Sequence, residues 1–310
     1  MKRKMISLIA AVLALTMLAG CSQVSIGESG DSLPVMGTDI PAELDAEGIY
    51  EAMKKAVGGR LATSFTSTTE MSADLTAAFL SMGAEVSAVT EIRLCEEPFR
   101  FYSASTVSAS CFGIDVDESF QIYSSRDNSG LSNYFHLDSA DKWLHQKMTM
   151  VPTDLLGQYA VTACGGNWKP ENLKLTAQTE NGYVLTCSFS AEDMLTAVVS
   201  PFGELSLDKV DLTGIRLDTV YYVDASTFLP TKIEIAYSGF GEIFTDLCNK
   251  YAGQIFNTFG AKFQADVTTY RETLSDLHYD AADIPQVPEA GLQNSTDVAK
   301  INILEYLNLK

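Results

Sequence analysis

Residues 61–79 read Leu-Ala-Thr-Ser-Phe-Thr-Ser-Thr-Thr-Glu-Met-Ser-Ala-Asp-Leu-Thr-Ala-Ala-Phe, and this stretch decides the fold class. Its large apolar side chains, among them Phe65, Met71 and Leu75, stand at odd-numbered positions, whereas Ser, Thr, Glu, Asp and Ala fill the even-numbered ones. A period of two puts successive side chains on opposite faces of an extended chain. The stretch therefore predicts a long β-strand with one buried face.

The same alternation continues in the residues that follow. It covers residues 84–95 and, after the turn Glu96-Glu97-Pro98, residues 99–111. Strands joined by tight turns pair in the antiparallel sense. Further strands are predicted around Phe120 and Ile122 and over residues 131–137, 142–150, 171–178, 183–189, 208–223, 231–237 and 265–279.

Five stretches have helical character instead. The first covers residues 41–57, with Pro41 at its start and Gly58-Gly59 at its end. The most regular one begins at Phe240 and carries an apolar stripe through Phe244 and Phe256 to Phe259. Shorter helices are predicted at residues 153–164 and 191–200, and another near residues 297–307.

These elements do not alternate regularly between strand and helix, which excludes a parallel α/β fold. They predict an α+β, mostly β fold: one large curved antiparallel sheet, a half-open barrel, with helices packed on its concave face. The predicted divisions are a signal peptide at 1–20, a flexible tether at 21–40, a sheet domain at 41–290 and a C-terminal tail at 291–310.

The N-terminus carries an export signal. Three basic residues, Lys2, Arg3 and Lys4, precede an apolar stretch that is too short to span a bilayer. The sequence Leu18-Ala19-Gly20-Cys21 that follows resembles the lipobox of bacterial lipoproteins. That resemblance implies that the Cys21 thiol is alkylated with a diacylglyceryl group and becomes the new N-terminus. We therefore expect an extracytoplasmic protein that is lipid-anchored to a bacterial membrane through Cys21.

The composition limits the partners. The formal net charge is −19, and removal of the basic signal peptide would make it still more negative. Such a surface is a poor partner for nucleic acid, so we expect no nucleic-acid binding. Besides Cys21 the chain has five cysteines without any C-x-x-C spacing, which favours buried thiols and leaves one disulfide open.

One hairpin resembles a known family. Residues 221–233 read Tyr-Tyr-Val-Asp-Ala-Ser-Thr-Phe-Leu-Pro-Thr-Lys-Ile, which is similar to a hairpin of the LolA-like lipoproteins. Asp224 is placed to cap the turn, and Pro230 begins the next strand. Asp141-Lys142-Trp143-Leu144 and Ile284-Pro285 also resemble elements of that family. The resemblance implies a strongly curved sheet around an apolar cavity that takes lipid tails or a protein segment, and it carries over no catalytic residue.

The motifs that could indicate an enzyme or a metal site lack the structural context or the residue spacing that such a site requires. Gly30-Asp31-Ser32-Leu33 spells a hydrolase motif but stands in the tether without a preceding strand. His136, His145 and His278 share no metal-ligand spacing. We therefore expect a non-enzymatic protein with no cofactor, no catalytic residue and no metal site.

Two functions remain open. In the first, the concave face holds a lipid or another apolar ligand against Phe101, Val107, Phe120, Ile122 and Leu185, which share the apolar parity of their strands. The small side chains from Ser103 to Ser110 leave space there for a ligand or for a closely packed helix. In the alternative, the core is filled and the lipoprotein is an envelope sensor or scaffold that binds another protein.

Overall fold

A computed structural model describes residues 44–148, 169–190, 214–249 and 262–300, apart from gaps at 59, 61, 78–79, 97, 112–113, 128–129, 243, 246–248 and 280–282. The predicted signal peptide, the tether and the helices at 153–164 and 191–200 lie outside these residues.

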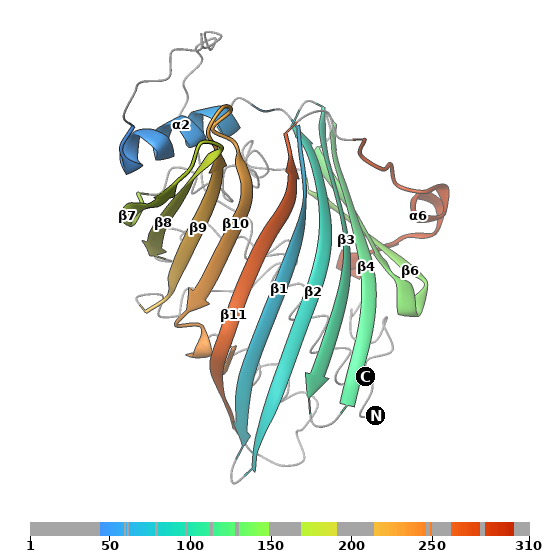
Figure 1. The fold of residues 1–310 in the computed structure, drawn as a ribbon. Coiled ribbons are helices and arrows are strands. Elements are labelled where there is room, and N and C mark those ends of the chain that lie inside the picture. Colours follow the sequence, from blue (N-terminus) through green and yellow to red (C-terminus); the bar gives the residue numbers. More distant parts are fainter. Residues whose placement is uncertain are drawn as a thin grey trace.

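The described residues form one twelve-stranded sheet with the order β12-β6-β5-β4-β3-β2-β1-β11-β10-β9-β8-β7 (Figure 1). The first run of antiparallel strands comprises β1 (Ala62–Ala77), β2 (Leu80–Glu96), β3 (Phe99–Cys111), β4 (Ile114–Asp127), β5 (Gly130–Leu137) and β6 (Lys142–Met148). The second run comprises β7 (Glu171–Gln178), β8 (Gly182–Ser190), β9 (Arg216–Asp224), β10 (Pro230–Ser238) and β11 (Phe263–His278).

Pairing between β1 and β11 joins the two runs at the middle of the sheet. Thr68 of β1 stands opposite Thr273 of β11, and the pairing extends along both strands. The order ends at β12 on one edge and at β7 on the other, so the sheet stays open. The predicted mostly-β class with one large antiparallel sheet is therefore confirmed. One strand was predicted too long, because Gly214 and Ile215 precede the first residue of β9, Arg216, without strand structure.

The buried face of the sheet, here called the inner face, follows the sequence alternation. Phe65, Met71 and Leu75 of β1 are 4–7 % exposed and belong to one apolar core. The same parity also buries Ser67 and Thr69, which are short enough to pack among larger neighbours. The opposite face is called the outer face.

Helix α2 (Ala46–Gly58) packs on the inner face beside β7 and β8, at one end of the sheet (Figure 1). Its stripe of Ile49, Tyr50, Met53 and Val57 is at most 2 % exposed, and the Tyr50 ring meets the Tyr221 ring edge-on at 6.1 Å. The predicted start at Pro41 is wrong, because the helix begins at Ala46.

Asp45 is the physical reason for that start. Its Oδ1 accepts a hydrogen bond of 2.8 Å from the Gly48 backbone N–H, and its carbonyl accepts one from Ile49. The first bond satisfies a backbone donor that the first helical turn leaves without a partner, and the second is the first regular hydrogen bond of the helix. A capping side chain therefore outweighs the preference of proline for helix starts.

The long helix predicted at residues 240–259 is described only at its beginning. Gly241, Glu242, Phe244, Thr245 and Asn249 are helical, and Phe244 is buried. The rings of Phe240 and Phe244 lie 5.4 and 6.1 Å from the Tyr270 ring of β11. The rest of the stripe, including Phe256, lies outside the described residues. In the described part of the chain, no helix has both the length and the apolarity required to cross a membrane.

The C-terminal strap, residues 283–300, packs on the outer face of the first run of strands (Figure 1). It contains α6 (Glu289–Asn294) and β12 (Thr296–Asp297), which pairs parallel with β6. Gly291 lies directly on the Trp143 ring, and the Arg93 guanidinium donates a hydrogen bond of 2.7 Å to the Asp283 carbonyl. The strap includes residues 291–300 of the predicted C-terminal tail. Of the helix predicted near residues 297–307, the structure describes only the start, where β12 ends at Asp297 and a 3-10 turn covers Val298–Lys300.

Candidate binding faces of the sheet

The structure brings together four of the five residues that the sequence assigned to a ligand. Phe101 and Val107 on β3 and Phe120 and Ile122 on β4 all point to the inner face and are 1–9 % exposed. Phe120 stands opposite Ser105, and Ile122 stands opposite Ser103. These four side chains therefore form one continuous area of the inner face.

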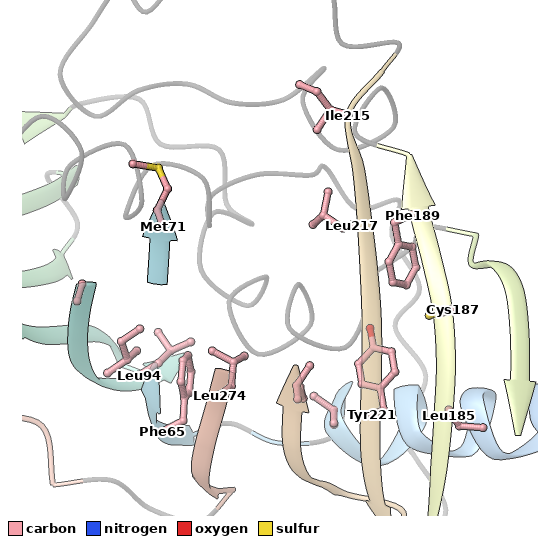
Figure 2. Packing of buried hydrophobic residues seen from close by; sticks show 14 of the residues in the cluster. Phe65, Met71, Leu94, Leu185, Cys187, Phe189, Ile215, Leu217, Tyr221 and Leu274 are labelled. Atoms are coloured by element: carbon pink, nitrogen blue, oxygen red, sulfur yellow. The ribbon is translucent and has the colours of Figure 1, made fainter. Parts of the chain in front are cut away.

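Leu185 lies in a different place. It is fully buried on β8, where Figure 2 shows it beside α2, with Tyr221 on the neighbouring strand. Seven strand steps separate β8 from β4 in the sheet order. Leu185 belongs to the same apolar core as the other four but not to their part of the face.

A strip of small side chains runs between the large ones. Ser103, Ser105 and Ala109 of β3 are 0–5 % exposed, and Ala88 and Thr90 stand beside this strand on β2. The Thr90 and Ser105 hydroxyl oxygens are 2.9 Å apart and satisfy each other. The fully buried Ser103 hydroxyl has no hydrogen-bond partner among the described residues. These five residues are called the inner strip.

The inner face also carries a carboxylate. Glu272 of β11 accepts hydrogen bonds of 2.6 Å from the Ser67 hydroxyl and of 2.6 Å from the Tyr237 hydroxyl. Its neighbours across the sheet are Thr69 on β1 and Ile235 on β10. Hydrogen bonds from two hydroxyls offset much of the cost of bringing a carboxylate against an apolar core.

A hollow of about 640 Å³ lies on the opposite side of the sheet. It crosses β7 to β11 and β1, and its exposed charged side chains are Lys174, Asp218, Arg271 and Glu70. Thr68, Thr186 and Thr273 supply hydroxyls between them. This hollow is called the outer groove.

A bulge in β7 brings Lys174 into the outer groove. Glu171 pairs with Ser188 and Lys174 pairs with Thr186, so the register skips a residue around Asn172, whose φ is +54°. A bulge re-aims the following side chains. Because of it, Glu171 and Lys174 both face outward although they are three residues apart.

Sequence reasoning did not identify the outer groove. Its charged residues come from four strands that are far apart in the chain, and alternation shows only that each one is exposed. Asn172, a residue type that tolerates a positive φ, is a local signal for the bulge. The alignment of Arg271 with Glu70 follows from the register between β11 and β1, which residue spacing does not reveal.

The turn between β9 and β10 matches its predicted role. Asp224 Oδ1 accepts hydrogen bonds from the hydroxyls of Ser226 and Thr227 at 2.6 and 2.9 Å, and from their backbone N–H groups at 3.0 and 2.8 Å. The hydrogen bond from the Ser226 hydroxyl is the main cause that lowers the Asp224 pKa, and the bonds from Thr227 add to it. Pro230 begins β10 as predicted.

Among the described cysteines, Cys95 and Cys187 form no disulfide. Cys187 is buried on the inner face, and burial, with a smaller effect of Asp218, raises the pKa of its thiol to about 12. The burial of Cys187 agrees with the sequence-based interpretation of this residue as a buried thiol. Cys21, Cys164 and Cys248 lie outside the described residues.

The histidines that the structure describes are not gathered at one site. His136 lies between Asp138 and Asp141, with nitrogen–oxygen distances of 3.0 and 3.3 Å, and stacks on Trp143. His145 stands on β6 and His278 ends β11. Among the residues described, no group of three or more His, Cys, Asp or Glu is arranged to hold a metal ion.

Comparison with known proteins does not assign the chain to a family. No family model matches it, and no curated protein matches it. Among solved structures, a DUF1329 family protein from Desulfovibrio piger ATCC 29098 aligns over 79 % of this chain and 96 % of its own, with 9 % identity and a TM-score of 0.24. A likeness at that TM-score supports no argument about fold or function.

Proposed function

We propose that this protein is a lipid-anchored extracytoplasmic lipoprotein that holds a lipid or another apolar ligand against the inner strip. The anchor rests on the basic N-terminus, the short apolar stretch and the lipobox-like sequence that ends at Cys21. Two acyl chains on one residue are sufficient for stable attachment to a membrane.

The inner strip is the observation that carries the binding proposal. The side chains of Ser103, Ser105 and Ala109 are small, whereas those of the neighbouring Phe120 and Ile122 are large. The small side chains therefore leave the inner face recessed next to β4. Apolar ligands bind to such concave, mainly apolar surfaces with few polar groups. The buried Ser103 hydroxyl would offer the ligand one hydrogen bond, because it has no partner among the described residues.

Two tryptophan substitutions, one on each face of the sheet, test this site. Val107 is 1 % exposed on the inner face, whereas Val89 is 51 % exposed and stands one strand away on the outer face. In the full chain, Val107→Trp is expected to abolish binding of a fluorescent fatty-acid probe. Val89→Trp introduces the same indole on the outer face and should leave binding unchanged.

The melting temperature of Val107→Trp completes the test. If a ligand space exists, the indole fills it and the melting temperature changes little. If the core is filled, overpacking should destabilise the protein by about 1–3 kcal/mol, and neither the wild type nor the variant should bind the probe. That result would favour the protein-binding scaffold.

The anchor has its own test. Cys21→Ala is expected to abolish incorporation of radiolabelled fatty acid, because the thiol at residue 21 is the group that the lipobox resemblance implies is alkylated. Cys95→Ala is the matched control and should be labelled like the wild type. Labelling that persists in Cys21→Ala would contradict the proposed attachment site.

A further inference from the structure

The outer groove is chemically unlike the inner strip. Among its described lining residues none is aromatic, and the apolar side chains that face it are limited to Val220 and Ala236, because Cys187 and Ile235 point to the inner face. Its surface is instead made of hydroxyls, an amide and charges of both signs. A lipid tail would gain little there, and a sugar ring would find no aromatic face on which to stack.

Three of its charged side chains are available to a ligand. Arg271, Lys174 and Glu70 make no side-chain hydrogen bond or ion pair with the residues that the structure describes, and all three are exposed. Glu234, by contrast, already accepts hydrogen bonds from Lys232 and from the Tyr222 hydroxyl. Asp218 accepts one bond from the Ser188 hydroxyl and keeps further acceptor capacity.

The charges that remain alternate in sign across the strands, because Glu234 of β10, which lies between Asp218 and Arg271, is already paired with Lys232. In the order of the sheet they are Lys174 on β7, Asp218 on β9, Arg271 on β11 and Glu70 on β1. Neighbouring strands are roughly 4.8 Å apart, so Asp218 and Arg271, which stand in one cross-strand row, are about 10 Å apart, and Lys174, which stands two residues along from that row, is about 12 Å from Asp218. An extended chain rises about 3.3 Å per residue, so three residues of a ligand roughly match each of these distances.

We propose that the outer groove binds an extended peptide segment whose charges alternate in sign every third residue. Acidic groups of the peptide would pair with Lys174 and Arg271, and a basic group between them would pair with Asp218. The hydroxyls of Thr186, Thr273 and Thr68 can donate to peptide carbonyls and accept from peptide N–H groups. A protein partner in the envelope would present such a segment as an extended tail or loop.

Two short peptides of opposite charge order test this proposal by isothermal titration calorimetry on the full chain. One reads Asp-Ser-Ser-Lys-Ser-Ser-Asp and the other Lys-Ser-Ser-Asp-Ser-Ser-Lys, both with blocked termini. The first carries net negative charge, and the protein has a formal net charge of −19. Overall electrostatics therefore favours the second peptide, whereas the order of charges in the groove favours the first. We expect the first to bind more tightly.

Matched substitutions locate the binding. Arg271→Gln and Lys174→Gln should each weaken binding of the Asp-ended peptide by about two- to fivefold, the effect of losing one partly solvated charge pair. Arg100→Gln, an exposed arginine on β3 away from the groove, should leave binding unchanged. Fatty-acid binding at the inner strip should be the same in all three variants, so this proposal and the proposed function fail independently.

Three results would overturn the proposal. One is tighter binding of the Lys-ended peptide, which would show that net charge alone governs the interaction. Another is equal weakening by Arg271→Gln and Arg100→Gln, which would place the peptide elsewhere. The third is absence of binding by both peptides to the folded full chain.

Discussion

The Tyr279 hydroxyl donates a hydrogen bond of 3.1 Å to the backbone carbonyl of Pro230. Tyr279 directly follows β11, Pro230 is the first residue of β10, and both are buried. The bond therefore ties the end of one long strand to the start of its neighbour. It also gives a buried carbonyl a hydrogen-bond partner at the point where proline begins the strand.

Tyr279→Phe removes this bond and leaves the ring in place. The free energy of unfolding should fall by about 1 kcal/mol, the usual net value of one buried hydrogen bond. Urea unfolding followed by circular dichroism measures the change. Tyr134→Phe is the control, because the Tyr134 hydroxyl makes no hydrogen bond with the described residues. Equal stability of Tyr279→Phe and wild type would show that the bond contributes nothing.

Asp224 makes the β9–β10 turn sensitive to acid. Its pKa is lowered in the folded protein, mainly by the hydrogen bond from Ser226, so its stabilising contribution is present at neutral pH. That contribution is lost as the pH falls through the lowered, folded-state pKa. Asp224→Ala should cost about 1 kcal/mol at pH 7, as for the loss of a helix-capping carboxylate.

The pH dependence of stability shows whether the negative charge of Asp224, and not only the shape of its side chain, stabilises this turn. The stability difference between wild type and Asp224→Asn should shrink as the pH falls below about 4, where carboxylates protonate. Thermal melts between pH 7 and pH 3 measure it, with the exposed Asp74→Asn as control. A difference that does not depend on pH would show that the turn does not use the charge of Asp224.

Alternation along the strands predicted most of the sheet correctly, because it reports directly which face is buried. Residues 171–178 were predicted as a strand with the same bounds as β7, and residues 99–111 with those of β3. The burial of Phe101, Val107, Phe120 and Ile122 follows from the same parity. A role in ligand binding for these four residues stays a prediction.

Features that depend on contacts between distant residues could not be read from the sequence. α6 and β12 are too short to show a period, and the strap is held by Trp143, about 150 residues earlier in the chain. The separation of Leu185 from the other four residues depends on strand order, and the outer groove depends on strand register. Local patterns contain neither kind of information.

Cys187 should be unreactive while the protein is folded. The thiolate is the nucleophilic form, and a pKa of about 12 leaves almost none of it at pH 8. Brief labelling with iodoacetamide followed by peptide mass spectrometry should modify the half-buried Cys95 well before Cys187. In urea the two sites should react alike. Rapid modification of Cys187 in the folded protein would mean that the inner face of β8 is open to solvent.

Gly291 sets how closely α6 approaches the sheet. A Cβ atom at this position would lie 2.6 Å from Cε3 of Trp143, so Gly291→Ala must displace either the helix or the ring. Hydrogen exchange of residues 289–297 should become faster in this variant. Gly83→Ala is the control, since its Cβ would meet nothing within 4 Å. Unchanged exchange in Gly291→Ala would show that the strap tolerates the larger side chain.

The most direct test of ligand binding at the inner strip is organic extraction of the purified full chain, followed by mass spectrometry. The Cys21→Ala background removes the covalent acyl groups, so that extracted lipid reports only the non-covalent ligand. We expect an apolar compound close to equimolar with the protein, and its loss when Val107→Trp is added. An extract from folded Cys21→Ala protein that holds no more apolar material than the Val107→Trp variant would contradict the account.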